Sequence, residues 1–222
     1  MNTQPLVIFG ASGHAKVILD IAEKQGSWNI LGLLDSYRPK GFELLGYSVL
    51  GSTEALADLL AAHPDLQVFI AIGDNHNRER IAIELQAAYP SIQFATLIHP
   101  GAHIAKVVSI GEGTVIMPGA VINNDSRIGE FVIINTNACV EHDGNMEDFS
   151  SLAQSVTLGG NCHIGRSSAI AIGATLKHGI QIGEHTVVGA GSLVLENIEP
   201  YSVAYGTPAK KVRSREKGEK YL

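Results

Sequence analysis

The chain has 222 residues, of which 45% are apolar and 24 are glycine, and it carries a formal net charge of −6. This composition suits a compact protein of one large or two modest domains, and the negative charge argues against general nucleic-acid binding. No apolar run is long enough for a membrane span, no secretory signal opens the chain, and two cysteines are too few for a disulfide framework, so we expect a cytoplasmic protein.

The first predicted elements are a short buried strand over residues 5–9 and an amphipathic helix over roughly 13–25. Between them lies the turn Gly10-Ala11-Ser12-Gly13-His14. Unpaired backbone N–H groups point outward where such a turn meets a helix, which favours an anion. The dinucleotide fingerprint is absent, because Ser12 stands at its second glycine. We predict a phosphate-binding turn, and a plain strand-to-helix turn is the alternative.

Polar residues also follow the next long apolar runs. Asp35 ends the run 30–34, near the position where an acidic residue contacts a ribose or base in comparable units, and Gly73 and Asn75 follow the run 67–72. Ligands gather at the carboxyl edge of open parallel sheets, so these three residues are candidates for substrate binding. A short strand over 46–50, a helix over 52–62 capped by Ser52 or Thr53, and a helix ending near residue 88 complete the pattern. Residues 1–92 therefore predict a small Rossmann-like βαβαβα domain.

A six-residue period organises the next part of the chain. Every sixth residue from Ile98 to Val194 is apolar, which gives seventeen positions without a miss. Six residues make one flat face and a corner, and three faces close a triangular coil. Four glycines fall at multiples of eighteen residues apart, so they line one corner where a side chain would crowd the turn: Gly111, Gly129, Gly165 and Gly183. Residues 93–199 are therefore predicted to form a hexapeptide-repeat parallel β-helix.

One corner of this predicted β-helix carries a reactive sequence, Val140-Glu141-His142-Asp143. With Val140 inward, His142 projects from the outer surface and is flanked by two carboxylates. A carboxylate bound to one imidazole nitrogen raises the basicity of the other, which suits a general base. His178 occupies the same repeat position two coils later, but Lys177 beside it disfavours an imidazolium. We predict His142 as the base, and a surface hydrogen-bonding histidine is the alternative.

After Val194 the six-residue period stops, and residues 200–222 are predicted to form a C-terminal loop and basic tail. The last fourteen residues hold six lysines and arginines against two glutamates. Such a segment on an acidic body can attract a phosphorylated small molecule. A solvated, frayed terminus is the alternative.

Four segments together resemble the bacterial sialic acid O-acetyltransferases and bacillosamine-type N-acetyltransferases: FGASGHAKVILDIA, FIAIGDNHNRERI, VIMPGAVINNDSRIGEFVIINTNACVEHD and GTPAKKV. The resemblance covers nearly the whole chain and joins an unusual N-terminal unit to an unusual repeat in the same order. It implies α/β plus β architecture, with a Rossmann-like domain followed by a left-handed parallel β-helix. It also implies a homotrimer that transfers acetyl from acetyl-CoA to a sugar.

The resemblance also implies roles for single residues. His142 matches the base and Asp143 the carboxylate after it, while Gly160 matches a glycine whose N–H supports the oxyanion of a tetrahedral intermediate. Ser151 stands where the family often has a histidine that contacts acetyl-CoA, and a serine hydroxyl can still donate a hydrogen bond. Asn135 matches a residue near the acceptor, and Asp35 one near the nucleobase. The nucleotide diphosphate is expected at Gly10, Ser12, Gly13 and His14, and coenzyme A is expected near Gly206, Pro208 and Lys210.

We therefore expect acetyl transfer to the 4-amino group of a UDP-linked 4-amino-4,6-dideoxy sugar in bacterial glycan biosynthesis. O-acetylation of sialic acid or a similar sugar is the first alternative. From a different class, the chain would be a non-catalytic ligand-binding scaffold or a zinc-dependent hydratase. Zinc would need ligands such as His142, His163 and His178, and no local spacing of ligand pairs supports a site, so we predict no metal.

Overall fold

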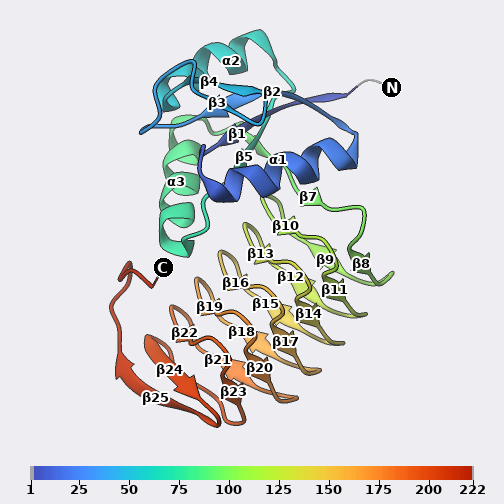
Figure 1. Ribbon diagram of the computed structural model, residues 1–222, viewed down its shortest axis with the longest axis vertical. Helices are drawn as coiled ribbons and strands as arrows, with labels where there is room; N and C mark the ends of the chain where they lie inside the picture. The colour runs from blue at the N-terminus through green and yellow to red at the C-terminus, as the bar shows by residue number, and fades with distance from the viewer. Residues whose placement is uncertain (1–2, 222) are drawn as a thin grey trace. The chain divides into compact units, whose positions relative to one another are not determined.

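The computed structural model describes residues 3–221, which fall into two compact units. The first holds the chain up to Gly73 together with Arg80–Pro100, and the second holds Asp74–Glu79 and the chain from Gly101 onward. Figure 1 shows the elements of both in chain order. No helix within residues 3–221 is long and apolar enough to cross a membrane.

A six-stranded sheet forms the centre of the first unit, with strand order β3-β4-β2-β1-β5-β6. β1 pairs in parallel with both β2 and β5, as a Rossmann-like unit requires. Its elements are β1 (Gln4–Phe9), α1 (Gly13–Gln25), β2 (Trp28–Leu34), β3 (Glu43–Leu44), β4 (Tyr47–Gly51), a 3₁₀ turn (Thr53–Ala55), α2 (Leu56–Ala62), β5 (Gln67–Ile70), α3 (Asn75–Ala88) and β6 (Gln93–Phe94).

Two strands of this sheet were absent from the sequence prediction. β3 and β6 are two residues long each, which is too short for an alternating pattern to be recognised. β3 turns back antiparallel onto β4 through Leu45 and Gly46, whose φ angles of 51° and 85° are those of a tight hairpin turn. The predicted capping also differs, because Ser52 precedes the 3₁₀ turn without a side-chain cap hydrogen bond.

Seventeen two-residue strands, β7 to β23, confirm the six-residue period, and each ends at one of the predicted aliphatic positions. The repeat opens with β7 (Leu97–Ile98). The first face contains β10 (Val115–Ile116), β13 (Ile133–Ile134), β16 (Ser151–Leu152), β19 (Ala169–Ile170) and β22 (Val187–Val188). The second contains β8 (His103–Ile104), β11 (Val121–Ile122), β14 (Cys139–Val140), β17 (Thr157–Leu158), β20 (Thr175–Leu176) and β23 (Leu193–Val194). The third contains β9 (Ser109–Ile110), β12 (Arg127–Ile128), β15 (Asn145–Met146), β18 (His163–Ile164) and β21 (Gln181–Ile182).

These faces close a left-handed parallel β-helix, whose stacked coils are visible in Figure 1. Ile122 pairs with Val140 and Val140 with Leu158, so successive coils are eighteen residues apart. The inward aliphatic side chains are buried in columns; Val140 and Leu158 are 0% exposed. A methylene buried in this way contributes about 0.8 kcal/mol, so the columns supply the main stabilisation of the unit.

The corners of the coils have a repeated backbone conformation. The third residue after an inward aliphatic has a positive φ in most coils, for example 61° at Asp125, 58° at Asp143 and 56° at Asn161. Aspartate, asparagine and glycine tolerate this left-handed region best. At the predicted glycine corner, a Cβ on Gly111 would lie 2.6 Å from the carbonyl carbon of Gly129, which confirms the expected crowding.

Within the second unit, the Asp74–Glu79 segment lies against the coils through buried polar contacts. Arg78 is 1% exposed, and its guanidinium donates to the carbonyl oxygens of Phe131 and Phe149 and to Asn75 Oδ1 at 2.8–3.0 Å. Burial lowers the pKa of Arg78 to about 10. Burial of Glu79 opposes its charge, but the hydrogen bond and charge of Arg166 hold the pKa of Glu79 below its usual value.

The C-terminal segment forms an antiparallel hairpin of β24 (Ser202–Gly206) and β25 (Ala209–Ser214) and then folds back. The Asn75 N–H donates to the Tyr221 hydroxyl at 3.0 Å, and the Arg215 guanidinium lies 5.3 Å from the Tyr221 ring centroid. Burial raises the pKa of the Tyr221 hydroxyl. This part of the tail is therefore packed, and a frayed terminus does not describe it.

Candidate active site

His142 lies at the corner between β14 and β15, where the second face meets the third. Its Nδ1 lies 2.7 Å from Asp143 Oδ2, and the two side chains are 56% and 51% exposed. The hydrogen bond to Asp143, together with the charges of Asp143 and Glu141, raises the pKa of His142 above its usual value. Because Asp143 holds Nδ1, the neutral imidazole presents Nε2 as its free basic atom.

Gly160 lies one coil further on, beneath the imidazole. A Cβ on Gly160 would be 2.6 Å from both Cε1 and Nε2 of His142, so only glycine leaves room for this ring position. The Gly160 N–H donates no hydrogen bond to another group of residues 3–221. The His178 ring follows on the next coil, with its centroid 6.3 Å from that of His142. His142, Asp143 and Gly160 therefore form one compact cluster.

The second carboxylate beside His142 points elsewhere. Glu141 Oε2 accepts a hydrogen bond from Asn123 Nδ2 at 2.9 Å, and its Oε1 lies 3.9 Å from Cys139 Sγ. Asn123 was not singled out from the sequence, although it precedes Glu141 by one eighteen-residue coil. Asp143 alone therefore orients the imidazole, while Glu141 acts on it only through its charge.

Two other predicted site residues lie away from this corner. Asn135 is at the corner between the first and second faces, where its Oδ1 accepts from the Thr136 N–H at 2.8 Å. Ser151 is on the first face and hydrogen-bonds the Tyr221 hydroxyl. One chain therefore does not bring Asn135 or Ser151 to His142.

The predicted coenzyme A residues of the C-terminal segment lie in the β24–β25 hairpin. Gly206 ends β24, Pro208 is in the connecting turn, and Lys210 in β25 forms an exposed ion pair with Glu196 at 3.1 Å. Exposed pairs of this kind contribute little to stability.

The predicted nucleotide turn lies at the carboxyl ends of β1 and β2 in the first unit. Gly10 has φ +115°, and a Cβ there would lie 2.9 Å from the Ala71 carbonyl oxygen. Asp35 Oδ2 accepts from the Ala11 N–H at 2.7 Å, and its Oδ1 accepts from two further backbone N–H groups. Ser12 is the residue before α1 and makes no side-chain cap hydrogen bond, while Gly13 and His14 begin the helix. Asp35 therefore holds the turn in shape.

The two predicted residues after β5 differ in their surroundings. Gly73 has open space where a Cβ would be. Asn75 is 1% exposed, and its amide donates to the Ser168 carbonyl and accepts from Arg78. Both ends of the amide are occupied, which gives Asn75 a structural role, and its predicted contact with substrate stays a prediction.

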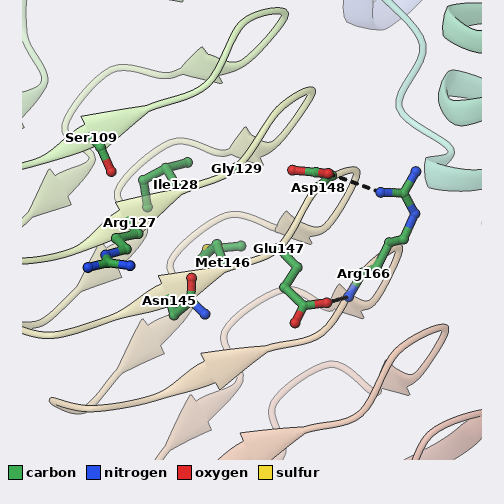
Figure 2. Close-up of a pocket in the computed structure, with 9 residues that line it drawn as sticks. All are labelled: Ser109, Arg127, Ile128, Gly129, Asn145, Met146, Glu147, Asp148 and Arg166. Carbon is green, nitrogen blue, oxygen red and sulfur yellow. Dashed lines mark hydrogen bonds and ion pairs between the residues drawn. The ribbon is translucent and has the colours of Figure 1, made fainter.

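Two open grooves flank the His142 corner. A groove of about 360 Å³ on the third face includes Ser109, Arg127 and Asn145, and Figure 2 shows Asp148 and Arg166 linked at its far end. A groove of about 610 Å³, here named the corner groove, runs along the corner itself and is lined by Lys106, Val107, Val108, Ser109, Asp125, Ser126, Arg127 and Asp143. The corner groove reaches the carboxylate that holds His142. Among residues 3–221, no three His, Cys, Asp or Glu side chains are grouped as a metal ion would require.

We expect Asp143→Asn to lower the pKa of His142, because the variant removes the hydrogen bond and charge that raise it. Asparagine keeps the left-handed φ of 58° at this position, so the backbone should not change. Histidine proton chemical shifts followed against pH measure the effect. Asp125→Asn, at the same corner one coil earlier with φ 61°, should leave the pKa of His142 nearly unchanged. An equal titration of His142 in wild type and Asp143→Asn would contradict the assigned contact.

Comparison with known proteins places the chain in a family. Residues 5–85 match the PglD N-terminal domain, and residues 161–196 match the bacterial transferase hexapeptide repeats. UDP-N-acetylbacillosamine N-acetyltransferase of Bacillus subtilis is 36% identical over 108 residues, a match that spans 49% of each chain.

Two solved structures are similar over nearly their whole length. A mutant GDP-perosamine N-acetyltransferase from Caulobacter crescentus, bound to CoA and GDP-perosamine, is 32% identical with a TM-score of 0.88; the match covers 95% of this chain and 97% of that one. The acetyltransferase domain of PglB from Neisseria gonorrhoeae is 30% identical with a TM-score of 0.86, covering 95% and 100%. The same PglB domain has been solved with acetyl coenzyme A. The chain therefore belongs to the family of hexapeptide-repeat sugar N-acetyltransferases that use acetyl-CoA.

Proposed function

We propose that this enzyme transfers acetyl from acetyl-CoA to the 4-amino group of a UDP-linked 4-amino-4,6-dideoxy sugar. The observation that carries the proposal is the exposed His142 imidazole, held by Asp143 at 2.7 Å and lying over Gly160. The Bacillus subtilis relative is named for a UDP-linked amino sugar, and the Caulobacter crescentus enzyme is named for a GDP-linked one. Both names support a nucleotide-linked acceptor for this chain.

In the proposed reaction, His142 Nε2 removes a proton as the sugar amine attacks the thioester carbonyl carbon. Asp143 fixes the tautomer and stabilises the imidazolium that forms. The Gly160 N–H, which has no other acceptor within residues 3–221, is available to the oxyanion of the tetrahedral intermediate. Collapse of the intermediate breaks the C–S bond and releases the CoA thiolate, which the imidazolium protonates.

A direct transfer without an acyl-enzyme suits the positions of the two cysteines. Cys162 is buried, and burial raises the pKa of its thiol. Burial and the Glu141 carboxylate likewise raise the pKa of the Cys139 thiol. Neither thiol has the lowered pKa of an activated nucleophile.

For the substrates, we assign the nucleotide diphosphate to the Gly10–His14 turn, with Asp35 and Gly73 at the same sheet edge. Coenzyme A is assigned to Gly206, Pro208 and Lys210 on the hairpin. We place this chemistry in the bacterial cytoplasm, where nucleotide sugars and acetyl-CoA are both available for glycan biosynthesis.

We also propose a homotrimer, because the site is incomplete within one chain. Asn135 and Ser151 lie on a different corner and a different face from His142, so a neighbouring copy is needed to bring such residues to the imidazole. The outward side chains of the second face are uncharged from Val121 to Leu193, which suits side-by-side packing of copies. They are Val121, Cys139, Thr157, Thr175 and Leu193.

Release of CoA thiol from acetyl-CoA tests the proposal. We expect turnover with a UDP-linked 4-amino-4,6-dideoxy sugar, and a kcat/KM at least tenfold lower for the GDP-linked and free sugars. Sialic acid should give no release above the rate of uncatalysed thioester hydrolysis. A preference for GDP would overturn the nucleobase assignment, and O-acetylation of sialic acid without N-acetylation would overturn the acceptor assignment.

A further inference from the structure

The carboxylate before the base has one oxygen that the protein uses only weakly. Glu141 is half-buried, and its Oε2 accepts a hydrogen bond from Asn123 Nδ2 at 2.9 Å. Its Oε1 has only the Cys139 thiol, a weak donor, at 3.9 Å. Within residues 3–221, Glu141 forms no ion pair with a cation. Because Asn123 holds the side chain in place, this oxygen is a preorganised acceptor for a ligand hydroxyl.

A groove on the second face lies beside this carboxylate. Its volume is about 400 Å³, and it is lined by residues 102–105 and 121–123 of the first two coils. Asn123 both lines the groove and bonds Glu141, which lies one coil further along the axis. Val121 adds apolar surface, so the groove offers the mixture of apolar contacts and hydrogen bonds that a sugar ring needs. A neighbouring copy on the second face would cover the groove, as expected for a site that one chain leaves incomplete.

The two side chains at this corner reach in opposite directions along the axis. The Glu141 carboxylate bonds Asn123 on the preceding coil, whereas the His142 imidazole lies over Gly160 on the following coil. Successive coils are about 4.8 Å apart, which is similar to the width of a pyranose ring. A sugar whose amine lies at His142 Nε2 can therefore extend its ring toward Glu141 and the groove.

The substituents next to the amine determine which group can bind Glu141. In a 4-amino-4,6-dideoxy sugar, C4 is flanked by C3, which carries a hydroxyl, and by C5, which carries a methyl group that donates no hydrogen bond. We propose that Glu141, positioned by Asn123, accepts a hydrogen bond from the C3 hydroxyl and thereby selects acceptors that carry it. This inference rests on the proposed function and concerns the sugar ring alone. The diphosphate keeps its assignment to the Gly10–His14 turn.

The test compares the nucleotide-linked 4-amino sugar with its 3-deoxy analogue in wild type and in Glu141→Gln. We expect wild type to prefer the 3-hydroxy sugar in kcat/KM by about tenfold to hundredfold, the usual effect of one hydrogen bond to a charged group. The glutamine oxygen can still accept from Asn123, but an NH2 group replaces the free acceptor, so the preference should fall below about threefold. Loss of the charge near His142 affects both sugars equally and cancels in this ratio.

Asn123→Ala tests the positioning, and Glu112→Gln is the matched control. Without the Asn123 amide the Glu141 carboxylate is free to rotate, so the preference for the 3-hydroxy sugar should fall at least about threefold. Glu112 is an exposed glutamate at the corner between β9 and β10, where the third face meets the first. Its substitution should leave the preference within about twofold of wild type.

The outcomes separate this inference from the proposed function. If wild type acetylates both sugars without preference, or if Glu141→Gln keeps the full preference, the inference is overturned while the proposed N-acetylation stands. A full preference in Asn123→Ala overturns the positioning role of Asn123. A wild-type enzyme that is inactive on every nucleotide-linked amino sugar refutes the function and the inference together.

Discussion

His142→Ala is expected to lower kcat for acetyl transfer by about 10²- to 10⁴-fold, the usual contribution of a positioned general base. The imidazole is held by one short hydrogen bond to Asp143 and lies against Gly160. Its loss removes the proton acceptor for the amine without altering the coil. Thioester cleavage followed spectrophotometrically at saturating substrates measures kcat. The melting temperature should stay within about one degree, because His142 is 56% exposed and makes no core contact.

His178→Ala provides the matched control for this variant. His178 occupies the same repeat position, with its ring centroid 6.3 Å from that of His142, but no carboxylate contact of the kind made by Asp143 is found for it within residues 3–221. We expect kcat to change less than about threefold. A loss below about tenfold in His142→Ala, or equal losses in the two variants, would show that His142 is not the base.

Arg78→Met is expected to destabilise the protein by at least about 1.5–3 kcal/mol, the usual contribution of a single hydrogen bond to a charged group. The Arg78 side chain is 1% exposed and donates to the carbonyl oxygens of Phe131 and Phe149. Methionine fills a similar volume but leaves both acceptors buried without this donor. Urea unfolding followed by circular dichroism measures the shift.

Arg80→Met is the control for the stability measurement, since Arg80 lies on the same helix, α3. Its guanidinium is 49% exposed and pairs with Glu84 across one helical turn. Such pairs contribute about 0.3–0.5 kcal/mol, so the unfolding midpoint should move only slightly. If the free energy of unfolding of Arg78→Met falls by less than about 1 kcal/mol, water must replace the lost donor, and the Arg78 hydrogen bonds do not stabilise the fold as expected.

The β-helix was predictable strand by strand because its stability comes from inward aliphatic residues with a strict local period. The same applies to His142 and Asp143, which are neighbours in sequence and contact each other through a single turn. β3 and β6 were missed because two residues contain no period. Sequence patterns therefore locate what is repeated or adjacent.

Contacts between distant segments were not predictable in this way. Asn75 follows β5 as a substrate-binding residue would, yet its amide contacts Ser168, 93 residues away. The Ser151 hydroxyl bonds Tyr221 in the tail, a contact that no sequence pattern indicated. A repeating sequence pattern does not indicate which polar groups form contacts when the start of α3 and the C-terminal tail pack against the β-helix. The hydrogen bond between Glu141 and Asn123 could have been predicted only from the eighteen-residue register, which places Asn123 one coil before Glu141.

Because every coil has the same height, the number of coils sets the distance along the β-helix axis between His142 and the C-terminal hairpin. Between His142 and the β24–β25 hairpin the chain adds length only in increments of one coil, about 4.8 Å each. The gain or loss of a whole coil would keep every face in phase while changing the distance between the His142 corner and the hairpin. An insertion of six residues would instead turn all later strands by one face and carry the hairpin around the prism. The distance from the His142 corner to the hairpin can therefore change only in whole turns of eighteen residues without rotating the faces.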